Sequence, residues 1–102
     1  MTVFSTILVA NRGEIAIRII RSAQKMGIKC VAVYVDADKN APYLAQADQS
    51  IKLETNYLDA DAILNAAQMT GSEAIHPGYG FLSENAKFAS SVEQSGLVWI
   101  GP

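Results

Sequence analysis

The part of the chain best suited to binding a ligand places a tyrosine between two glycines. It reads His76-Pro77-Gly78-Tyr79-Gly80-Phe81-Leu82-Ser83-Glu84-Asn85. Because glycine permits backbone conformations and close approaches that other residues do not, we expect Tyr79 to face a cleft. Ser83 can cap a following helix, whose free backbone amides would favour a carbonyl or an anionic group. We interpret His76 as a structural histidine rather than a general base, and Phe81 and Leu82 as core contacts.

A second segment with polar side chains, Asn11-Arg12-Gly13-Glu14, lies at an expected turn from a strand to a helix. A dinucleotide-binding turn there would have the pattern G-x-G-x-x-G, and only Gly13 of the three glycines is present. Asp36 follows the next expected strand, where a ribose-binding acid would lie, but an acid that opens a loop needs no ligand. Arg12 and Glu14 could meet an anion or each other, or fix the turn by bonds inside it. For Glu14 the structural role in the turn is favoured, because an acid in the first turn of a helix interacts well with the helix dipole.

The remaining residue types exclude several kinds of catalytic site. The single cysteine, Cys30, rules out an intrachain disulfide and a cysteine-based zinc cluster. Its apolar neighbours predict an inert buried thiol. The sequence has no Ser/His/Asp set on a nucleophile turn, no phosphate-binding Walker loop and no metal-ligand cluster around its one histidine. We therefore predict no catalytic residue and no metal site in this chain by itself.

Both polar segments are placed by an alternation of short apolar runs and amphipathic helices. The periodicity predicts five strands and three full helices, with one more helical turn started by Pro42. The strands are expected at 6–10, 29–35, 49–53, 74–76 and 97–100. The helices begin at Gly13, after an Asp59 cap and after Ser83, and they are ended by Gly27, Gly71 and Gly96.

This order of elements predicts an α/β fold. Strands joined by right-handed crossover helices form a parallel sheet with helices on both faces. The expected domain is a doubly wound, Rossmann-like parallel sheet of about five strands. In such folds ligands meet the carboxyl ends of the strands, and residues 11–14 and 76–82 both fall there.

Length and composition fit one globular domain. Of the 102 residues, 50% are hydrophobic and 18% are charged, which suffices for one modest core. No apolar run approaches the length of a membrane span, and the sequence does not open with a secretory signal. Together with the single cysteine, these features predict a reducing, cytoplasmic location.

The net charge of −2 is unevenly distributed along the chain. Residues 1–30 have five basic residues and one acid, whereas the rest has three basic residues and nine acids. Arg18, Arg21 and Lys25 lie on the polar side of the first expected helix. A basic face on an acidic body favours a specific interface over a groove for a polyanion, and the alternative is a solvated face without a partner. Nucleic acid and membrane are therefore not expected partners.

The polar segments also resemble the signatures of a known family. The run from Ile7 to Ala16, with Arg18 after it, resembles the N-terminus of biotin carboxylases, and residues 76–85 resemble their second signature. The ending Ile100-Gly101-Pro102 is similar as well, so the likeness covers essentially all 102 residues. It implies that residues 1–102 are the biotin carboxylase N-terminal domain, which precedes the ATP-grasp domain. Since the chain stops directly after a strand, we expect it to be a fragment of a longer ligase.

The resemblance implies a reaction and its cofactors. The complete enzyme uses MgATP and bicarbonate to form carboxyphosphate, and then carboxylates biotin on a carrier domain. The residues that bind ATP, Mg and bicarbonate lie further along the parent chain, so we expect the fragment alone to bind none of these and to be inactive. The implied partners are the ATP-grasp and C-terminal domains, the biotin carboxyl carrier domain and a second copy of the parent in a homodimer.

Some residues acquire roles by the same resemblance. Tyr79 and Gly80 match the family's loop near the approach of biotin, and Glu84 matches an acid close by. Arg18 and Arg21 match positions that some members use at the homodimer interface. The turn Asn11-Arg12-Gly13-Glu14 is the structural signature of the first motif.

The sequence departs from the family in places, and other interpretations remain open. Lys25 stands where some members have the acid that pairs across the dimer, and the loop at residues 54–56 is shortened. One alternative is the corresponding domain of an ATP-grasp ligase that does not use biotin, against which residues 76–85 count. Another is a stand-alone Rossmann-like binding module that uses the basic helix, against which the abrupt end at Pro102 counts. The resemblance includes acetyl-CoA, propionyl-CoA, methylcrotonyl-CoA, pyruvate and urea carboxylases alike.

Overall fold

A five-stranded, all-parallel sheet forms the centre of the computed structural model, which describes residues 4–101. The strand order is β3-β2-β1-β4-β5. The strands are β1 (Thr6–Val9), β2 (Lys29–Tyr34), β3 (Gln49–Lys52), β4 (Ala74–His76) and β5 (Val98–Trp99). The helices are α1 (Gly13–Lys25), α2 (Pro42–Gln46), α3 (Ala60–Met69) and α4 (Ala86–Gln94), with a 3-10 turn, η1, at Asp36–Asp38. The predicted doubly wound α/β fold is confirmed.

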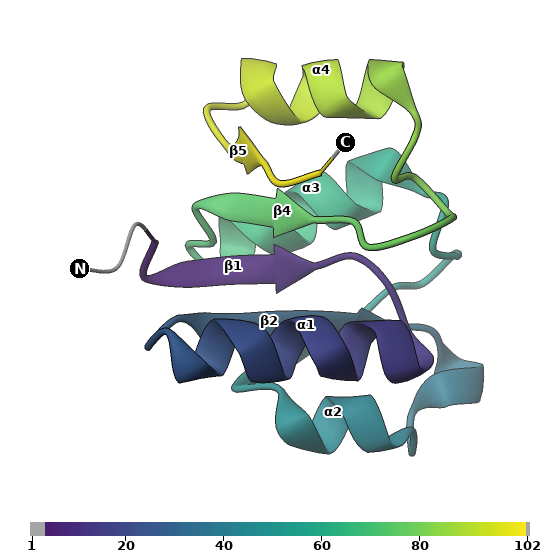
Figure 1. Cartoon of the computed structure of the whole chain (residues 1–102). Coiled ribbons are helices and arrows are strands. Elements are labelled where there is room, and N and C mark those ends of the chain that lie inside the picture. The colour runs from purple at the N-terminus through teal and green to yellow at the C-terminus, as the bar shows by residue number, and fades with distance from the viewer. Residues whose placement is uncertain (1–3, 102) are drawn as a thin grey trace.

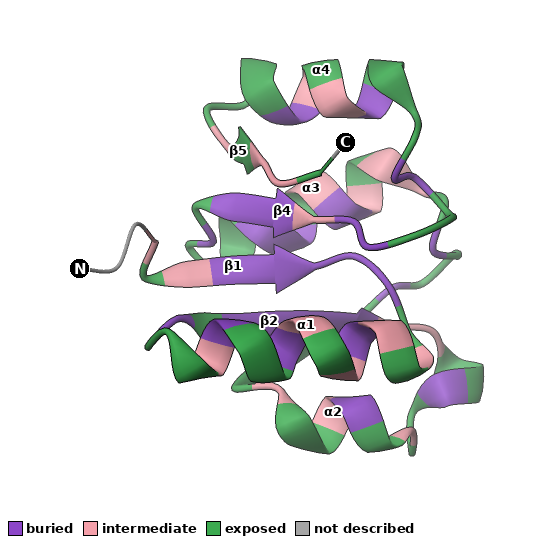
Figure 2. Ribbon diagram, viewed as in Figure 1, coloured by how far each residue is buried: buried purple, intermediate pink, exposed green. Residues whose placement is uncertain are grey.

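The helices form one layer on each face of the sheet (Figure 1). Helices α1 and α2 pack on one face and α3 and α4 on the other. Successive residues of β2 alternate between the layers: Cys30 and Ala32 pack towards α1, and Val31 and Val33 towards α3. Figure 2 shows the central strands β1, β2 and β4 largely buried between helices whose outer faces are exposed. Two apolar cores therefore share one sheet.

Most helix boundaries agree with the sequence, and one cap differs. Asp59 caps α3 by accepting a hydrogen bond from the amide of Ala62 at 3.1 Å. The expected cap of the last helix, Ser83, is wrong, because Asn85 accepts the bond from the amide of Phe88 at 2.9 Å. Residues 81–84 continue as turns, in which the Ser83 amide donates to the carbonyl of Gly80. The backbone becomes extended, as a cap requires, only at Asn85.

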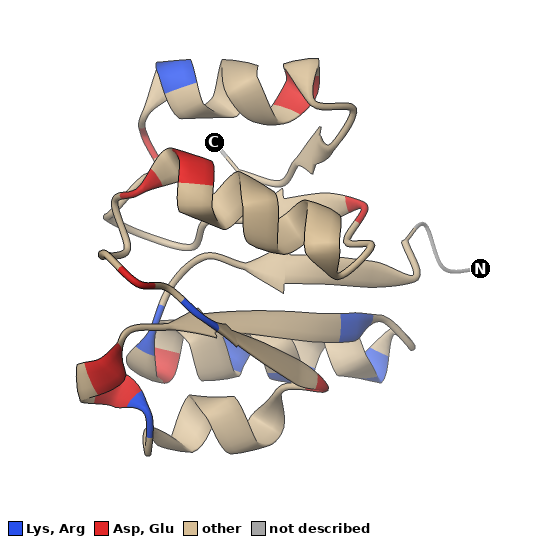
Figure 3. Cartoon of the chain, turned by 180° about the vertical axis from the view of Figure 1, so that it is seen from behind, with Lys and Arg blue, Asp and Glu red and all other residues tan. Residues whose placement is uncertain are grey.

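Charged residues are separated over the surface. Three of the eight basic residues lie on α1, while most acids lie in the loops and helix starts at the carboxyl edge of the sheet (Figure 3). Within residues 4–101, none of the helices is both long enough and apolar enough to cross a membrane.

Candidate functional site at the carboxyl edge of the sheet

The two polar segments of the sequence lie side by side at the carboxyl ends of β1 and β4. These strands are neighbours, with Val9 opposite His76, and the amide of Ala10 donates to the carbonyl of His76 at 2.9 Å. From this point the chain runs to α1 on one face and towards α4 on the other. In doubly wound folds this switch of direction opens the crevice where ligands bind.

Asn11 joins the two segments through its buried side chain. Its Nδ2 donates to the carbonyl of Pro77 at 2.8 Å and to the carbonyl of Tyr79 at 2.6 Å. Its Oδ1 accepts from the amide of Arg12 at 2.8 Å. Only 1% of Asn11 is exposed, so water cannot replace these bonds without a rearrangement. The signature turn of the first motif therefore holds the backbone of the second.

The two glycines beside Tyr79 serve different purposes. Both have positive φ angles of 68°, which other L-residues rarely adopt. A Cβ on Gly78 would lie 2.7 Å from Nδ2 of Asn11 and 2.9 Å from Cγ2 of Ile15, so this glycine also permits a close approach. A Cβ on Gly80 would meet no atom within 4 Å. Gly78 thus lets the loop pack closely against Asn11 and Ile15, while Gly80 borders open space.

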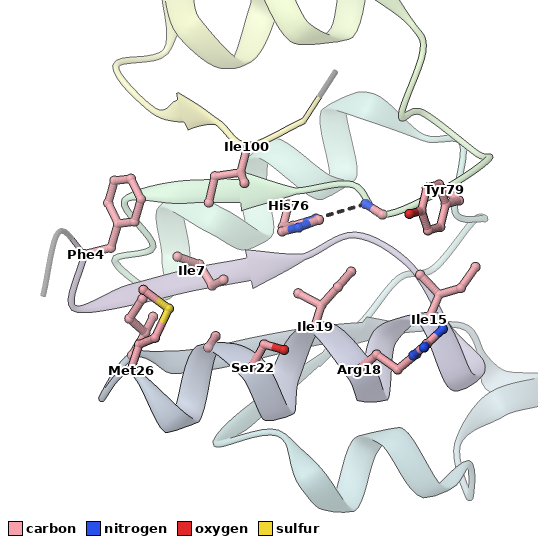
Figure 4. A pocket seen from close by; sticks show the side chains of 13 residues that line it. Phe4, Ile7, Ile15, Arg18, Ile19, Ser22, Met26, His76, Tyr79 and Ile100 are labelled. Carbon is pink, nitrogen blue, oxygen red and sulfur yellow. Dashed lines mark hydrogen bonds between the residues drawn. The ribbon is translucent and has the colours of Figure 1, made fainter.

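Tyr79 projects from this anchored loop into solvent. It is 77% exposed and lies at one end of a groove that Ile15 and Arg18 also line (Figure 4). The expected exposure at a cleft agrees with this geometry. Leu82 is buried as expected, but Phe81 is 44% exposed, so its interpretation as a core residue is wrong. Phe81 lies at the start of the turn at residues 81–84 with a φ of 49°, and its ring packs on Tyr57 with the centroids 5.4 Å apart.

His76 has the structural role that the sequence suggests. Its Nδ1 accepts a hydrogen bond from the amide of Gly78 at 3.1 Å. Burial lowers the pKa of the imidazole, which favours the neutral ring that this acceptor role requires. The histidine thus fixes from within the loop the same backbone that Asn11 holds from the turn between β1 and α1.

Arg12 forms an ion pair with a carboxylate that follows β2, and not with Glu14. Its Nε and Nη2 each lie 2.6 Å from an oxygen of Asp38. Tyr57 donates to the same carboxylate at 2.5 Å, and the hydroxyls of Tyr57 and Tyr43 are 2.8 Å apart. Sequence reasoning missed this cluster of four side chains, since they come from four separate loops and helices that only the folded sheet edge brings together.

The protonation states of the cluster are fixed at neutral pH, so its side chains are not poised to exchange protons in catalysis. Hydrogen bonds from Arg12 and Tyr57 lower the pKa of Asp38 to about 2. Burial raises the pKa of both Tyr43 and Tyr57, so both phenols stay neutral at neutral pH. Asp36, the candidate ribose acid, is exposed and lies 3.6 Å from Nζ of Lys52. No group of His, Cys, Asp and Glu side chains within residues 4–101 is arranged to hold a metal ion.

Of the candidate residues not yet placed, Arg18 alone lines the same groove as Tyr79. Glu84 is exposed just before α4 and lines a smaller pocket with Ser90 and Trp99. Arg18 lines the groove, whereas Arg21 is exposed on α1 and does not line it. Glu14 is exposed in the first turn of α1. Cys30 is buried, and burial raises the pKa of its thiol to about 11, as expected for an inert side chain.

Comparison with known proteins identifies the family of this domain. Residues 3–102 match the family described as "Biotin carboxylase, N-terminal domain". The chain belongs to this family. The propionyl-CoA carboxylase alpha chain of Ruegeria pomeroyi is 48% identical over 97% of the chain, which spans 15% of that relative. The biotin carboxylase of Allochromatium vinosum is 50% identical over 94% of the chain, which spans 22% of that protein.

Solved structures of biotin carboxylases have the same fold. The biotin carboxylase domain of Hydrogenobacter thermophilus 2-oxoglutarate carboxylase, a dimer in complex with MgADP and bicarbonate, superposes with a TM-score of 0.95 at 44% identity. The chain covers 23% of that protein, which in turn matches all of this chain. The Kluyveromyces lactis urea carboxylase gives a TM-score of 0.94 at 52% identity, over 97% of this chain and 9% of that protein. These matches decide between the alternatives that the sequence left open in favour of the biotin carboxylase N-terminal domain.

Proposed function

We propose that this chain works as the N-terminal domain of an ATP-dependent ligase that carboxylates biotin, and that it is inactive by itself. The names of its relatives support a carboxylase, and the MgADP and bicarbonate bound to one of them support these as ligands of the whole enzyme. ATP would supply the energy that activates bicarbonate. The chain spans only 15% and 22% of the two relatives compared above, so the remaining machinery lies outside this domain.

The residues of this domain do not fit a MgATP site. Both carboxylate oxygens of Asp38 face Arg12, and Tyr57 binds the same group. Within the described part of the chain no acidic cluster is suited to Mg²⁺. Nucleotide and metal would therefore be bound by other domains, and no chemical step is assigned to side chains of this one.

In the reaction, this domain would supply an aromatic surface that contacts biotin. Tyr79 presents an exposed aromatic ring, while the Asn11 side chain holds its backbone from inside. This combination is the observation that carries the proposal, because a fixed backbone orients an exposed ring at no further cost in loop entropy. Gly80 leaves space beside the ring for a close approach. Glu84, at the start of α4, would lie further along the same approach.

We further propose the partners and the location that the sequence suggests. Arg18 and Arg21 on α1 would contribute to a homodimer of the parent enzyme, for which the dimeric Hydrogenobacter thermophilus domain is a precedent. The carrier domain would bring biotin to the edge at Tyr79. A cytoplasmic location follows from the single cysteine and the apolar pattern of the sequence.

A chimera tests this function. In it, the chain replaces the matching N-terminal part of the Allochromatium vinosum biotin carboxylase, to which it is 50% identical. The chimera should carboxylate free biotin in the presence of MgATP and bicarbonate, and the isolated chain should neither do so nor hydrolyse ATP. A folded chimera that binds ADP but carboxylates no biotin would contradict the proposal, as would bicarbonate-dependent ATP turnover by the isolated chain.

A further inference from the structure

A long apolar groove lies on the α1 side of the sheet (Figure 4). It has a volume of about 760 Å³. Its lining is largely aliphatic and aromatic, and includes Phe4, Ile7, Ile19, Met26, Ile28 and Ile100. Tyr79 stands at one end and Phe4 with Met26 at the other. The groove is therefore continuous with the proposed biotin edge but extends well beyond it.

The groove exists because helices cover the sheet unevenly. Helix α1 packs over β1 and β2, and α2 lies further out over β2. On this face no helix within residues 4–101 covers β4 and β5, whereas α3 and α4 lie on the opposite face. Strands of an all-parallel sheet are normally covered on both faces. An element from outside the described residues would complete this layer.

The dimensions of the groove suit an α-helix. Its wall on the α1 side runs from Ile15 to Met26, the residue that caps α1, which is eleven steps along the helix and so about 16 Å at 1.5 Å per residue. Ile15, Ile19 and Met26 form a ridge at helical spacing, of the kind that fits between the side chains of a second helix. Three turns of helix laid along α1 would fill this length.

The polar groups of the groove favour a helix over a small ligand. A pocket for a small molecule normally has several convergent polar groups. Here His76 already accepts a hydrogen bond from Gly78 through Nδ1. Arg18 is exposed at the rim, and no acid within the described part of the chain pairs with it. An occupant with an apolar face would match this lining.

The position of Ile100 indicates where the occupant comes from. Ile100 forms the wall opposite α1 (Figure 4), and it lies near the end of a domain that the family describes as N-terminal. The polypeptide that follows this domain in a biotin carboxylase therefore starts beside the groove. A short connection of this kind gives a high effective concentration at the groove.

We propose that this groove is the docking site for an amphipathic helix of about three turns from the polypeptide that follows this domain in a biotin carboxylase. Its apolar side packs between Ile19 and Ile100. The proposal rests on the proposed function, since it takes the partner from the same enzyme.

Two methionines make a matched pair for the test. Met26 borders the groove and is 62% exposed, and Met69, at the end of α3 on the other face of the sheet, is 67% exposed. Hydrogen peroxide oxidises exposed methionines to the sulfoxide. In the isolated chain both should therefore react at similar rates, measured by mass spectrometry of peptides. In the chimera the rate at Met26 should fall by about tenfold, with the rate at Met69 unchanged.

A variant in the groove connects this protection to docking. Ile19→Asp places a charge in the groove, so it should restore the oxidation of Met26 in the chimera. In the isolated chain it should lower the melting temperature but leave the chain folded, because Ile19 packs against the core on this face and is only partly buried. Equal oxidation of Met26 and Met69 in the chimera would overturn the proposal. So would a protection of Met26 that is lost when the chimera is diluted to the monomer, which would point to a second copy.

These outcomes separate the docking site from the proposed function. A chimera that carboxylates biotin while Met26 stays reactive contradicts docking but keeps the function. A chimera that protects Met26 but carboxylates no biotin keeps the docking site and contradicts the function.

Discussion

Asn11 and Tyr79 lie at the same edge of the sheet, but their side chains differ in burial and in hydrogen bonding. Asn11 is buried, and both ends of its amide group are hydrogen-bonded within the domain. Tyr79 is exposed, although its own carbonyl is one of the groups that Asn11 holds. The inner side of this edge is thus built for stability and the outer side for contact. Substitutions on the inner side should lower the free energy of unfolding, and those on the outer side should affect binding.

The largest effect is expected at Gly78. Gly78→Ala would place a Cβ 2.7 Å from Asn11 and 2.9 Å from Ile15, at a φ of 68°. Overpacking and backbone strain together should lower the free energy of unfolding by about 3 kcal/mol. Gly80→Ala is the matched control, since it has the same φ but no neighbour within 4 Å, and it should cost only about 1 kcal/mol. Urea unfolding of the isolated chain measures both, and equal losses would contradict the close packing of the inner side.

Asn11→Ala should come next. It removes the donor to the carbonyls of Pro77 and Tyr79 in a buried site, so a loss of about 2 to 3 kcal/mol is expected. The comparison is Tyr79→Ala, which should change the free energy of unfolding by less than about 0.5 kcal/mol. The same urea series measures both variants. A larger loss for Tyr79→Ala than for Asn11→Ala would reverse the assignment of the two sides.

A smaller effect depends on pH and on Asp38. The pKa of Asp38 is about 2 in the folded chain, below the value of about 3.9 for an unfolded aspartate. The stability from its ionised form is therefore fully present above pH 4 and is lost as the pH falls from about 4 to about 2. With Arg12 half exposed, we expect about 1 to 2 kcal/mol. The free energy of unfolding of Asp38→Asn should be lower than that of the unsubstituted chain at pH 7, and the difference should be much smaller at pH 2.5.

Asp36→Asn provides the control for this titration. Asp36 is exposed and lies 3.6 Å from Lys52, and exposed pairs contribute about 0 to 1 kcal/mol. Its substitution should leave the dependence of stability on pH nearly unchanged. If Asp36→Asn and Asp38→Asn gave the same profile, the Arg12–Asp38 pair would not be the source of acid sensitivity.

The weakest effect concerns the basic face of α1. A single exposed ion pair contributes only about 0 to 1 kcal/mol, so both arginines are changed together. Reversing Arg18 and Arg21 to Glu in the chimera should shift it towards monomer, more clearly at low salt because salt screens these charges. Reversing Lys39 and Lys87, which are exposed elsewhere, changes the net charge equally and should leave the dimer intact. Analytical ultracentrifugation at nanomolar concentration distinguishes them. An unchanged sedimentation profile for the Arg18 and Arg21 variant would exclude this face from the interface.

The sequence predicts the sheet and the exposed loop well because both depend on local patterns. Alternating runs and helical spacing place the five strands, and the glycines around Tyr79 predict its exposure. The Arg12–Asp38 pair could not be predicted, since its partners are 26 positions apart and meet only when β1 and β2 pair. The cap of α4 was misplaced because Ser83 and Asn85 are both good caps, and only the turn at 81–84 selects Asn85.

The most direct test of the central claim compares two aromatic residues of one loop. Tyr79→Ala in the chimera should lower kcat/KM for biotin by about tenfold to a hundredfold, equivalent to about 1 to 3 kcal/mol, while the KM for ATP and the melting temperature stay near normal. Phe81→Ala is the control: it removes a partly exposed ring that packs on Tyr57 of the same domain, so it should lower the melting temperature without a selective effect on biotin. Normal biotin kinetics for Tyr79→Ala, or a parallel loss for ATP and biotin, would contradict the assignment of Tyr79 to the biotin approach.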